Sequence, residues 1–239
     1  MHPDPPMPDM PTDPERTRGR YRYLLDGDPA GVEERFMVGE VAGGAVRVRS
    51  TRVSATPVSR LEVDARLNPG RSDVLVRWTG SAPGVIREAT ATIAAAGGTV
   101  TTTRTIDGAR YDETITAGSL YPLMRAFTGL QVLASVAGPH GVVVPDVADP
   151  SDGRRFLAPV PSERSAVPLG GRTVVVDGME RAGSAYRWVG GAYPDGAEFV
   201  VDPGGLLLEY VVDQTAGRWQ VSLADVTGPW PVPLDWPAA

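Results

Sequence analysis

The sequence predicts a mainly β fold in which one large, curled antiparallel sheet, a half-barrel, wraps around a single central α-helix. Three observations predict it. Apolar and polar residues alternate over many short segments, as expected for strands with one buried face. Glycine pairs and Asp-Gly pairs separate these segments at a spacing of roughly ten residues, which favours hairpins in an antiparallel sheet. By contrast, residues 119–136 carry apolar side chains at intervals of three and four, which is typical of a helix.

The chain begins with a segment that predicts no regular structure. Residues 1–18 are rich in Pro and Asp and predict a disordered arm. The alternating residues Arg16, Arg18, Arg20 and Arg22 follow, and they predict a solvated strand edge in preference to an anion-binding arm.

The first half of the chain then predicts a run of strands joined by tight turns. Gly43-Gly44, Gly97-Gly98 and Asp107-Gly108 supply residues that tolerate positive φ, as hairpin turns require. The expected strands cover residues 21–25, 32–41, 46–49, 61–67, 74–78, 85–96, 99–106 and 110–117.

The predicted helix covers residues 119–136. Ser119 is the expected N-cap, and Gly138-Pro139 ends the segment. Arg125 is the only charged residue, so this helix must be buried on most sides. Gly129 costs about 1 kcal/mol relative to Ala in a helix interior. It marks either a close approach to a strand or a break between two shorter helices.

The second half predicts a loop and then more strands. Residues 140–153 form the loop, and the expected strands cover residues 154–160, 172–176, 185–189, 197–201, 206–212 and 218–226. Residues 19–227 therefore form a single domain. The tail, residues 228–239, contains Trp230 and Trp236 and is expected to dock on the body, because exposed Trp is uncommon.

Composition excludes several classes of chemistry. The 239-residue chain has no Cys, its 23 basic residues are all Arg, and it has two His. The absence of Lys excludes a Walker-type phosphate loop and a Schiff base. The absence of Cys excludes disulfides, thiol nucleophiles and zinc knuckles. We expect no cofactor and no metal site. The net charge of −6 argues against nucleic-acid binding.

The order of elements resembles a bacterial family of uncharacterised domains with a half-barrel related to the lipoprotein-carrier (LolA/LppX-like) fold. The putative glycolipid-binding family is more distantly similar. The resemblance covers roughly residues 20–226 and rests on a Tyr-rich opening strand (21–27), the mid-chain helix, an Asp-Pro…Asp-Gly turn (149–153) and a closing segment (199–210). It implies a hydrophobic molecule bound between sheet and helix, and it carries over no catalytic residue.

The helix and the strand aromatics supply the candidate ligand-binding residues. A curled sheet over one apolar helix either packs as a core or leaves a cavity. In the second case the apolar lining and a few polar groups would bind a ligand. The expected lining is Leu123, Met124, Phe127, Leu130, Trp78 and Trp188, with Tyr186, Arg187 and Arg125 at its mouth.

The titratable residues that could act in catalysis or bind a metal mostly have structural explanations. His140 is a possible general base, but no Gly-x-Ser-x-Gly elbow accompanies it. Asp146, Asp149 and Asp152 fail the calcium-loop spacing and are read as turn formers. Glu33 and Glu34 are adjacent, so on a strand they face opposite sides. Glu62, Asp64 and Arg66 share a face and form a self-compensating, solvated surface.

These observations favour non-catalytic binding of a hydrophobic or lipid-like small molecule. The first alternative is a small-molecule enzyme that uses the same cavity with His140 or a carboxylate as the acid–base group. The second is a protein-interaction module that uses the Trp-containing tail. The sequence has neither a transmembrane segment nor a signal peptide, so a cytoplasmic location is expected unless the start codon is misassigned. It names neither the ligand nor a protein partner.

Overall fold

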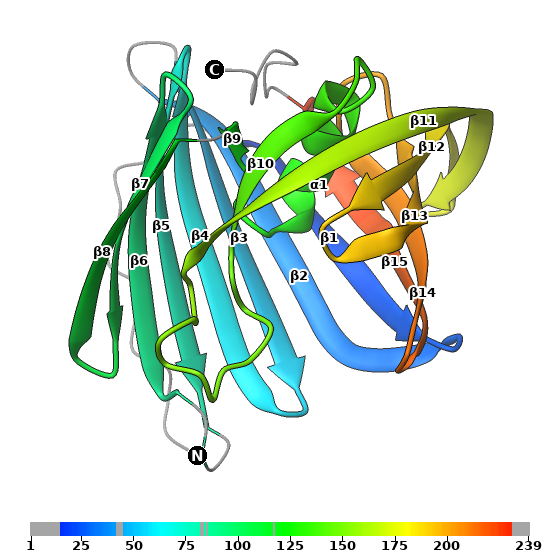
Figure 1. Cartoon of the computed structure of the whole chain (residues 1–239). Coiled ribbons are helices and arrows are strands. Elements are labelled where there is room, and N and C mark those ends of the chain that lie inside the picture. The colour runs from blue at the N-terminus through cyan, green and yellow to red at the C-terminus, as the bar shows by residue number, and fades with distance from the viewer. Residues whose placement is uncertain (1–14, 42–44, 82–83, 85, 117, 231–239) are drawn as a thin grey trace.

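The computed structural model describes residues 15–41, 45–81, 84, 86–116 and 118–230. These residues form one curled, open sheet of 15 strands with a short helix inside the curl, which confirms the predicted fold class (Figure 1). The strands are β1 (Glu15–Leu25), β2 (Asp28–Val41), β3 (Ala45–Ala55), β4 (Val58–Asn68), β5 (Arg71–Gly80), β6 (Glu88–Ala96), β7 (Thr99–Ile106), β8 (Ala109–Thr116), β9 (Ser119–Leu120), β10 (His140–Pro145), β11 (Pro159–Val176), β12 (Met179–Gly190), β13 (Tyr193–Val201), β14 (Leu207–Gln214) and β15 (Gly217–Thr227).

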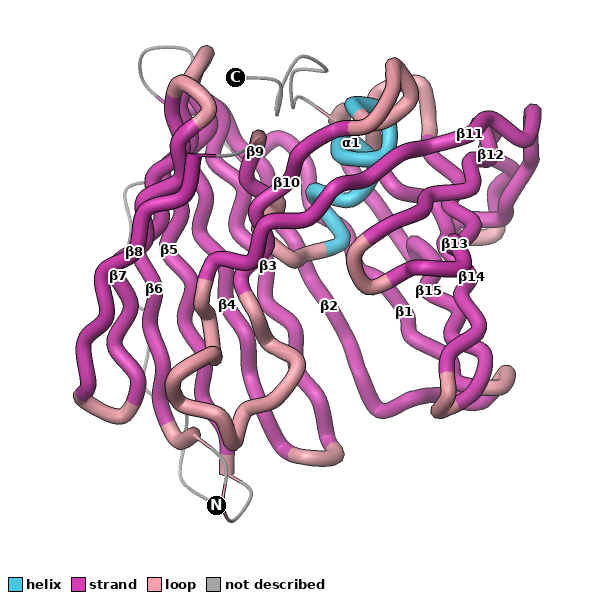
Figure 2. The backbone as a smooth tube through the Cα atoms, viewed as in Figure 1, coloured by secondary structure: helices cyan, strands magenta, loops and turns pink. Residues whose placement is uncertain are grey.

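The sheet has two arms that meet at the ends of the chain. Its order is β8-β7-β6-β5-β4-β3-β2-β1-β15-β14-β13-β12-β11-β10-β9, so β1 pairs with β15 in the middle. Neighbouring strands are antiparallel except β9 and β10, which are parallel. The helix α1 (Arg125–Ala134) lies within the curl and packs against β14, β13 and β11 (Figure 2). In the described part of the chain, no helix has the length and apolarity that crossing a bilayer requires.

Alternation along each strand produces the core, as predicted. On β4, Leu61, Val63 and Ala65 point into the curl and are buried, whereas the residues between them face outward. The hairpins use the expected Asp-Gly chemistry. Asp107 and Gly108 both have positive φ, 44° and 88°, which matches the twist of the flanking strands.

The helix is shorter than predicted. The prediction of a helix over 119–136 with Ser119 as N-cap is wrong, because α1 has 10 residues and its N-cap is Met124. Leu123 has φ of 67° and Met124 is extended, so the chain cannot be helical there. Ser119 instead belongs to β9, and the Tyr121 N–H donates to the carbonyl of Val143. Pairing with β10 thus satisfies backbone groups that a longer helix would have used.

Gly129 marks a close approach, one of the two predicted readings. A Cβ at this position would lie 2.2 Å from the carbonyl oxygen of Gly205 and 2.9 Å from the backbone nitrogen of Leu207. Since α1 is continuous through Gly129, the alternative of two shorter helices is wrong. The glycine therefore lets the helix backbone lie directly on the turn that leads into β14.

Other boundaries also differ from the predictions. Residues 140–145 form β10, not the start of a loop, and residues 154–158 form turns. The strands predicted separately over 154–160 and 172–176 are joined in β11, which begins at Pro159. β1 starts at Glu15, inside the predicted arm 1–18, because it pairs on both sides, with β2 and β15. For the same reason Arg18, Arg20 and Arg22 do not lie on a strand edge. Residues 1–14 lie outside the described residues.

The start of the C-terminal tail docks on the body. Trp230 packs edge-on against Phe36, with ring centroids 5.7 Å apart. The Thr17 hydroxyl donates to the carbonyl of Pro229. Trp230 is thus partly buried, as predicted for the tail, and Trp236 lies outside the described residues.

Candidate binding groove

The helix residues predicted to line a cavity are packed in the core of this structure. Met124, Phe127 and Leu130 each have 0% of their surface exposed. A space large enough for a water molecule would leave part of its walls accessible, so none adjoins these side chains. Leu123 is only half-buried. A ligand beside α1 would have to displace packed side chains, and ligand binding there stays a prediction.

The other predicted lining residues belong to separate clusters. The Trp188 ring contacts Tyr121, Tyr193 and Phe199, and its Nε1–H donates to the Ser135 hydroxyl over 3.1 Å. Trp78 lies on β5 and packs against Phe156, with ring centroids 5.2 Å apart.

The polar residues predicted at the cavity mouth also differ in their surroundings. Tyr186 is half-buried and Arg187 is exposed. Arg125 donates to the Tyr210 hydroxyl over 3.2 Å, and its guanidinium lies 4.5 Å from the centre of the Tyr210 ring. Burial raises the pKa of Tyr210 to about 12, so this tyrosine stays neutral at physiological pH.

Glu34 is a buried carboxylate at the start of α1. It is 0% exposed and accepts hydrogen bonds from the Tyr23 hydroxyl over 2.8 Å, the Ser50 hydroxyl over 3.2 Å and the Arg125 backbone N–H over 2.6 Å. A carboxylate at a helix N-terminus satisfies donors that the helix leaves unpaired. Its neighbour Glu33 faces outward, so the prediction that the two acids lie on opposite faces is confirmed.

His140 has a partner that the sequence did not reveal. Its Nε2 lies 2.7 Å from the Ser119 Oγ, across the β9–β10 pair. Partial burial lowers the pKa of His140, which favours the neutral imidazole at physiological pH. Ser119 itself is only 4% exposed. The parallel pairing of β9 with β10 brings together two side chains that are 21 residues apart in the chain. No local sequence motif therefore reveals their contact.

The remaining acidic candidates stabilise local structure, as predicted. Asp146, Asp149 and Asp152 each accept a hydrogen bond from the backbone N–H two residues further on. Among the described residues, no three His, Cys, Asp or Glu side chains come together as a metal site would require. On β4, Glu62 and Asp64 are compensated as predicted, but their ion-pair partners are Arg60 and Arg47, over 2.7 and 2.5 Å, and not Arg66.

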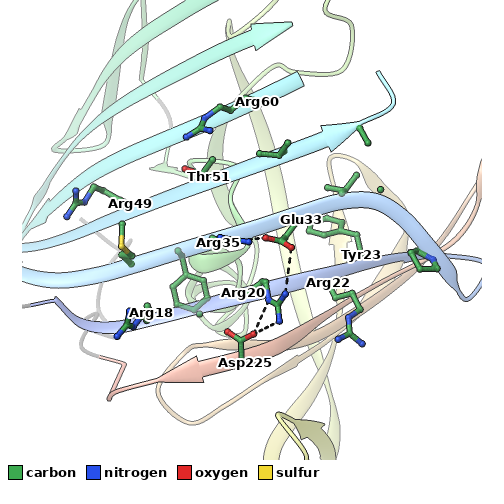
Figure 3. A pocket seen from close by; sticks show the side chains of 18 residues that line it. Arg18, Arg20, Arg22, Tyr23, Glu33, Arg35, Arg49, Thr51, Arg60 and Asp225 are labelled. Atoms are coloured by element: carbon green, nitrogen blue, oxygen red, sulfur yellow. Dashed lines mark hydrogen bonds and ion pairs between the residues drawn. The ribbon is translucent and has the colours of Figure 1, made fainter. Parts of the chain in front are cut away.

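An open groove lies on the outer face of the sheet instead. It has a volume of about 1020 Å³ and runs over β1–β4 and the edge of β15 (Figure 3). Its lining contains six arginines and two carboxylates, a net charge of +4, on a chain whose net charge is −6. The arginines are Arg18, Arg20, Arg22, Arg35, Arg49 and Arg60, and the carboxylates are Glu33 and Asp225.

Strand register arranges these side chains in three rows across the sheet. The first row is Arg18–Met37–Arg49, the second is Arg20–Arg35–Thr51, and the third is Arg22–Glu33–Val53–Arg60. Successive rows are two residues apart along each strand, so about 7 Å separates them. All of these side chains point outward, because residues of the same parity share one face of a strand.

Carboxylates neutralise the second row. Arg20 and Arg35 lie directly opposite each other, an arrangement that is unfavourable for like charges. Glu33 contacts both guanidinium groups, and Asp225 pairs with Arg20 over 2.8 Å (Figure 3). The Asp225 hydrogen bond raises the pKa of Arg20. The first row contains no carboxylate within the groove lining.

Sequence reasoning missed the groove, although it noted its first arginines. The alternation of Arg18, Arg20 and Arg22 indicated one outward face. Nothing local showed that Arg49 and Arg60 would lie on the same face two and three strands away, because that depends on the register of three hairpins.

Comparisons with known proteins support the fold. No protein-family model matches the sequence, and no curated protein matches it. Among solved structures, the chain is similar to a β-barrel-like protein of the domain of unknown function DUF1849 from Brucella abortus. The TM-score is 0.57 over 90% of this chain and 98% of that chain, at 8% sequence identity. This similarity confirms a barrel-like fold shared with an uncharacterised bacterial domain, and it shows the fold alone.

Proposed function

We propose that this protein binds a lipid-like, anionic amphiphile without catalysis, in the arginine-lined groove on its outer face. One observation carries the proposal: an open groove of about 1020 Å³ combines several guanidinium groups with exposed apolar side chains. Small-molecule sites usually occupy about 300–1,000 Å³ and combine an apolar lining with a few polar groups. This groove is therefore large enough for a ligand with both a charged head and a tail.

The apolar part of the lining suits a hydrocarbon tail. Val53 is 43% exposed in the third row, and Met37 is half-buried in the first. Met adapts its shape to apolar ligands. The resemblance to lipoprotein-carrier and glycolipid-binding families supports the same ligand class. The proposed site differs from the cavity between sheet and helix, because the core around Phe127 has no space in this structure.

A single substitution in the groove tests the site. Val53→Glu places a negative charge beside the tail and should weaken binding of cis-parinaric acid, a fluorescent fatty acid, by about tenfold, a factor typical of one unfavourable charge in a site. The measurement is a fluorescence titration. Val175→Glu is the matched control, because Val175 is also an exposed strand valine, 66% exposed, on the β11–β12 hairpin. Equal affinities of the Val53→Glu variant and the wild type would refute the groove as the site.

The Ser119–His140 pair tests whether the function is non-catalytic. A hydrogen-bonded Ser and His can form a nucleophile and its base. However, Ser119 is only 4% exposed, so we expect a fluorophosphonate probe to leave it unmodified, as judged by intact-protein and peptide mass spectrometry. Labelling of Ser119 that disappears in His140→Ala would contradict the non-catalytic proposal and favour the alternative of a small-molecule enzyme that uses His140.

A further inference from the structure

Carboxylates lie beside the arginines of the second and third rows, whereas the first row has no carboxylate within the groove lining. Arg20 and Arg35 in the second row are paired with Glu33 and Asp225, and Arg60 in the third row is paired with Glu62 over 2.7 Å. Arg22 lies opposite Glu33 in the strand register. At the other end, Arg18 has no carboxylate partner among the residues that the structure describes, and Met37 lies opposite it.

Arg49 lies on the other side of Met37 from Arg18. The two arginines are on β1 and β3, so their backbones are about 9.5 Å apart, twice the spacing of neighbouring strands. Both side chains are long enough to reach a group held above Met37. Arg49 also has an interaction within the protein, and a guanidinium with five N–H donors can contact more than one group at a time. The next acid in the row, Asp64, is held by Arg47.

We propose that Arg18 and Arg49 bind the head group of the amphiphile, and that this head group is a phosphate monoester or a similar tetrahedral dianion. This inference rests on the function proposed above. A carboxylate has two oxygens, which one guanidinium fork satisfies. A phosphate monoester has three terminal oxygens and nearly two charges at pH 7, so it can accept from two guanidinium groups at once. Val53 lies two rows away, about 13 Å along the strand, where the tail would lie.

The test compares ligands that share one tail. Dodecyl phosphate, dodecanoate and the neutral dodecyl maltoside are titrated below their micelle concentrations by calorimetry. We expect dodecyl phosphate to bind about tenfold more tightly than dodecanoate, in line with a second charged hydrogen-bonded pair. Arg18→Gln should weaken dodecyl phosphate by about tenfold and change dodecyl maltoside by less than about twofold. Arg77→Gln is the matched control, because Arg77 is also an exposed strand arginine but lies on β5, outside the groove lining, and it should change both by less than about twofold.

The outcomes separate this inference from the proposed function. If none of the three amphiphiles binds, the proposed function fails. If dodecyl phosphate and dodecanoate bind with similar affinity, both more tightly than dodecyl maltoside, and Arg18→Gln has no effect, the function stands and the head-group inference is wrong. If inorganic phosphate bound as tightly as dodecyl phosphate, the proposal of an amphiphilic ligand would be wrong, and the ligand would be free phosphate. Binding only to vesicles that contain phosphatidic acid would overturn the proposal that the groove holds a single amphiphile molecule. It would indicate that the ligand is a membrane surface.

Discussion

Gly129→Ala should lower the free energy of unfolding by about 2 kcal/mol, although Ala is the better helix former. The new Cβ would lie 2.2 Å from the carbonyl oxygen of Gly205, a contact that only a backbone shift can relieve. Such overpacking costs about 3 kcal/mol, and the gain in helix propensity offsets about 1 kcal/mol of it. Urea unfolding followed by circular dichroism measures the change as a lower midpoint at an unchanged slope.

Gly171→Ala is the control for that experiment. A Cβ on Gly171 has no atom within 4 Å, and its backbone is not left-handed, so the variant should unfold at the wild-type midpoint. If Gly129→Ala were more stable than the wild type, helix propensity alone would determine the effect of the substitution on stability. The close packing of α1 on the turn before β14 would then be incorrect.

Arg104→Leu should release the strap, which we define as residues 146–158 between β10 and β11. Arg104 is 3% exposed and extends from β7 to the strap. Its guanidinium donates to the carbonyls of Arg154 and Phe156 over 2.5 and 3.0 Å, and it pairs with Glu113 over 2.8 Å. Removal leaves the buried carbonyl of Phe156 and the partly buried carbonyl of Arg154 unpaired, and a buried acceptor left unpaired costs about 1–3 kcal/mol. We expect a total loss of about 3 kcal/mol.

The loss of stability should appear first in the strap and only then in the rest of the molecule. Hydrogen exchange should accelerate at Phe156 and Leu157, whose N–H groups donate to strap carbonyls, and limited proteolysis should cut within the strap. Trp78 packs against Phe156, so its fluorescence should also change. Arg110→Leu on the next strand removes an exposed arginine paired with Asp112 and should change none of these readouts. Uniform destabilisation of all regions by Arg104→Leu would contradict a strap held by this one side chain.

Release of the strap would also test the cavity that the sequence predicted. The strap lies over the inner side of β5 and β7 and reaches the segment before β6, because it contacts Trp78, Arg104 and Ile86. If the Arg104→Leu variant gained affinity for a neutral hydrophobic probe, an interior site would exist in addition to the outer groove. The packed structure, with Phe127 and Leu130 at 0% exposure, leads us to expect no such gain.

Local pattern determined much of this protein from the sequence alone. Alternation placed the strands and the side of the sheet on which each residue lies, including the opposite orientations of Glu33 and Glu34. Pairs such as Asp107-Gly108 determined the turns, because positive φ is a property of one or two residues. Composition excluded whole classes of chemistry. Each of these features depends on residues that are neighbours in the chain.

Tertiary structure decided the rest, because it depends on residues that are distant in the chain. The apolar periodicity of 119–136 was consistent with a helix throughout, but pairing between β9 and β10 converted its start into a strand. The Ser119–His140 contact has the same origin. The groove required Arg18 and Arg49 to lie on either side of Met37, which three strands in register achieve and no local motif encodes. The chain thus specified which residues face outward, and only the assembled sheet specified which of them lie together.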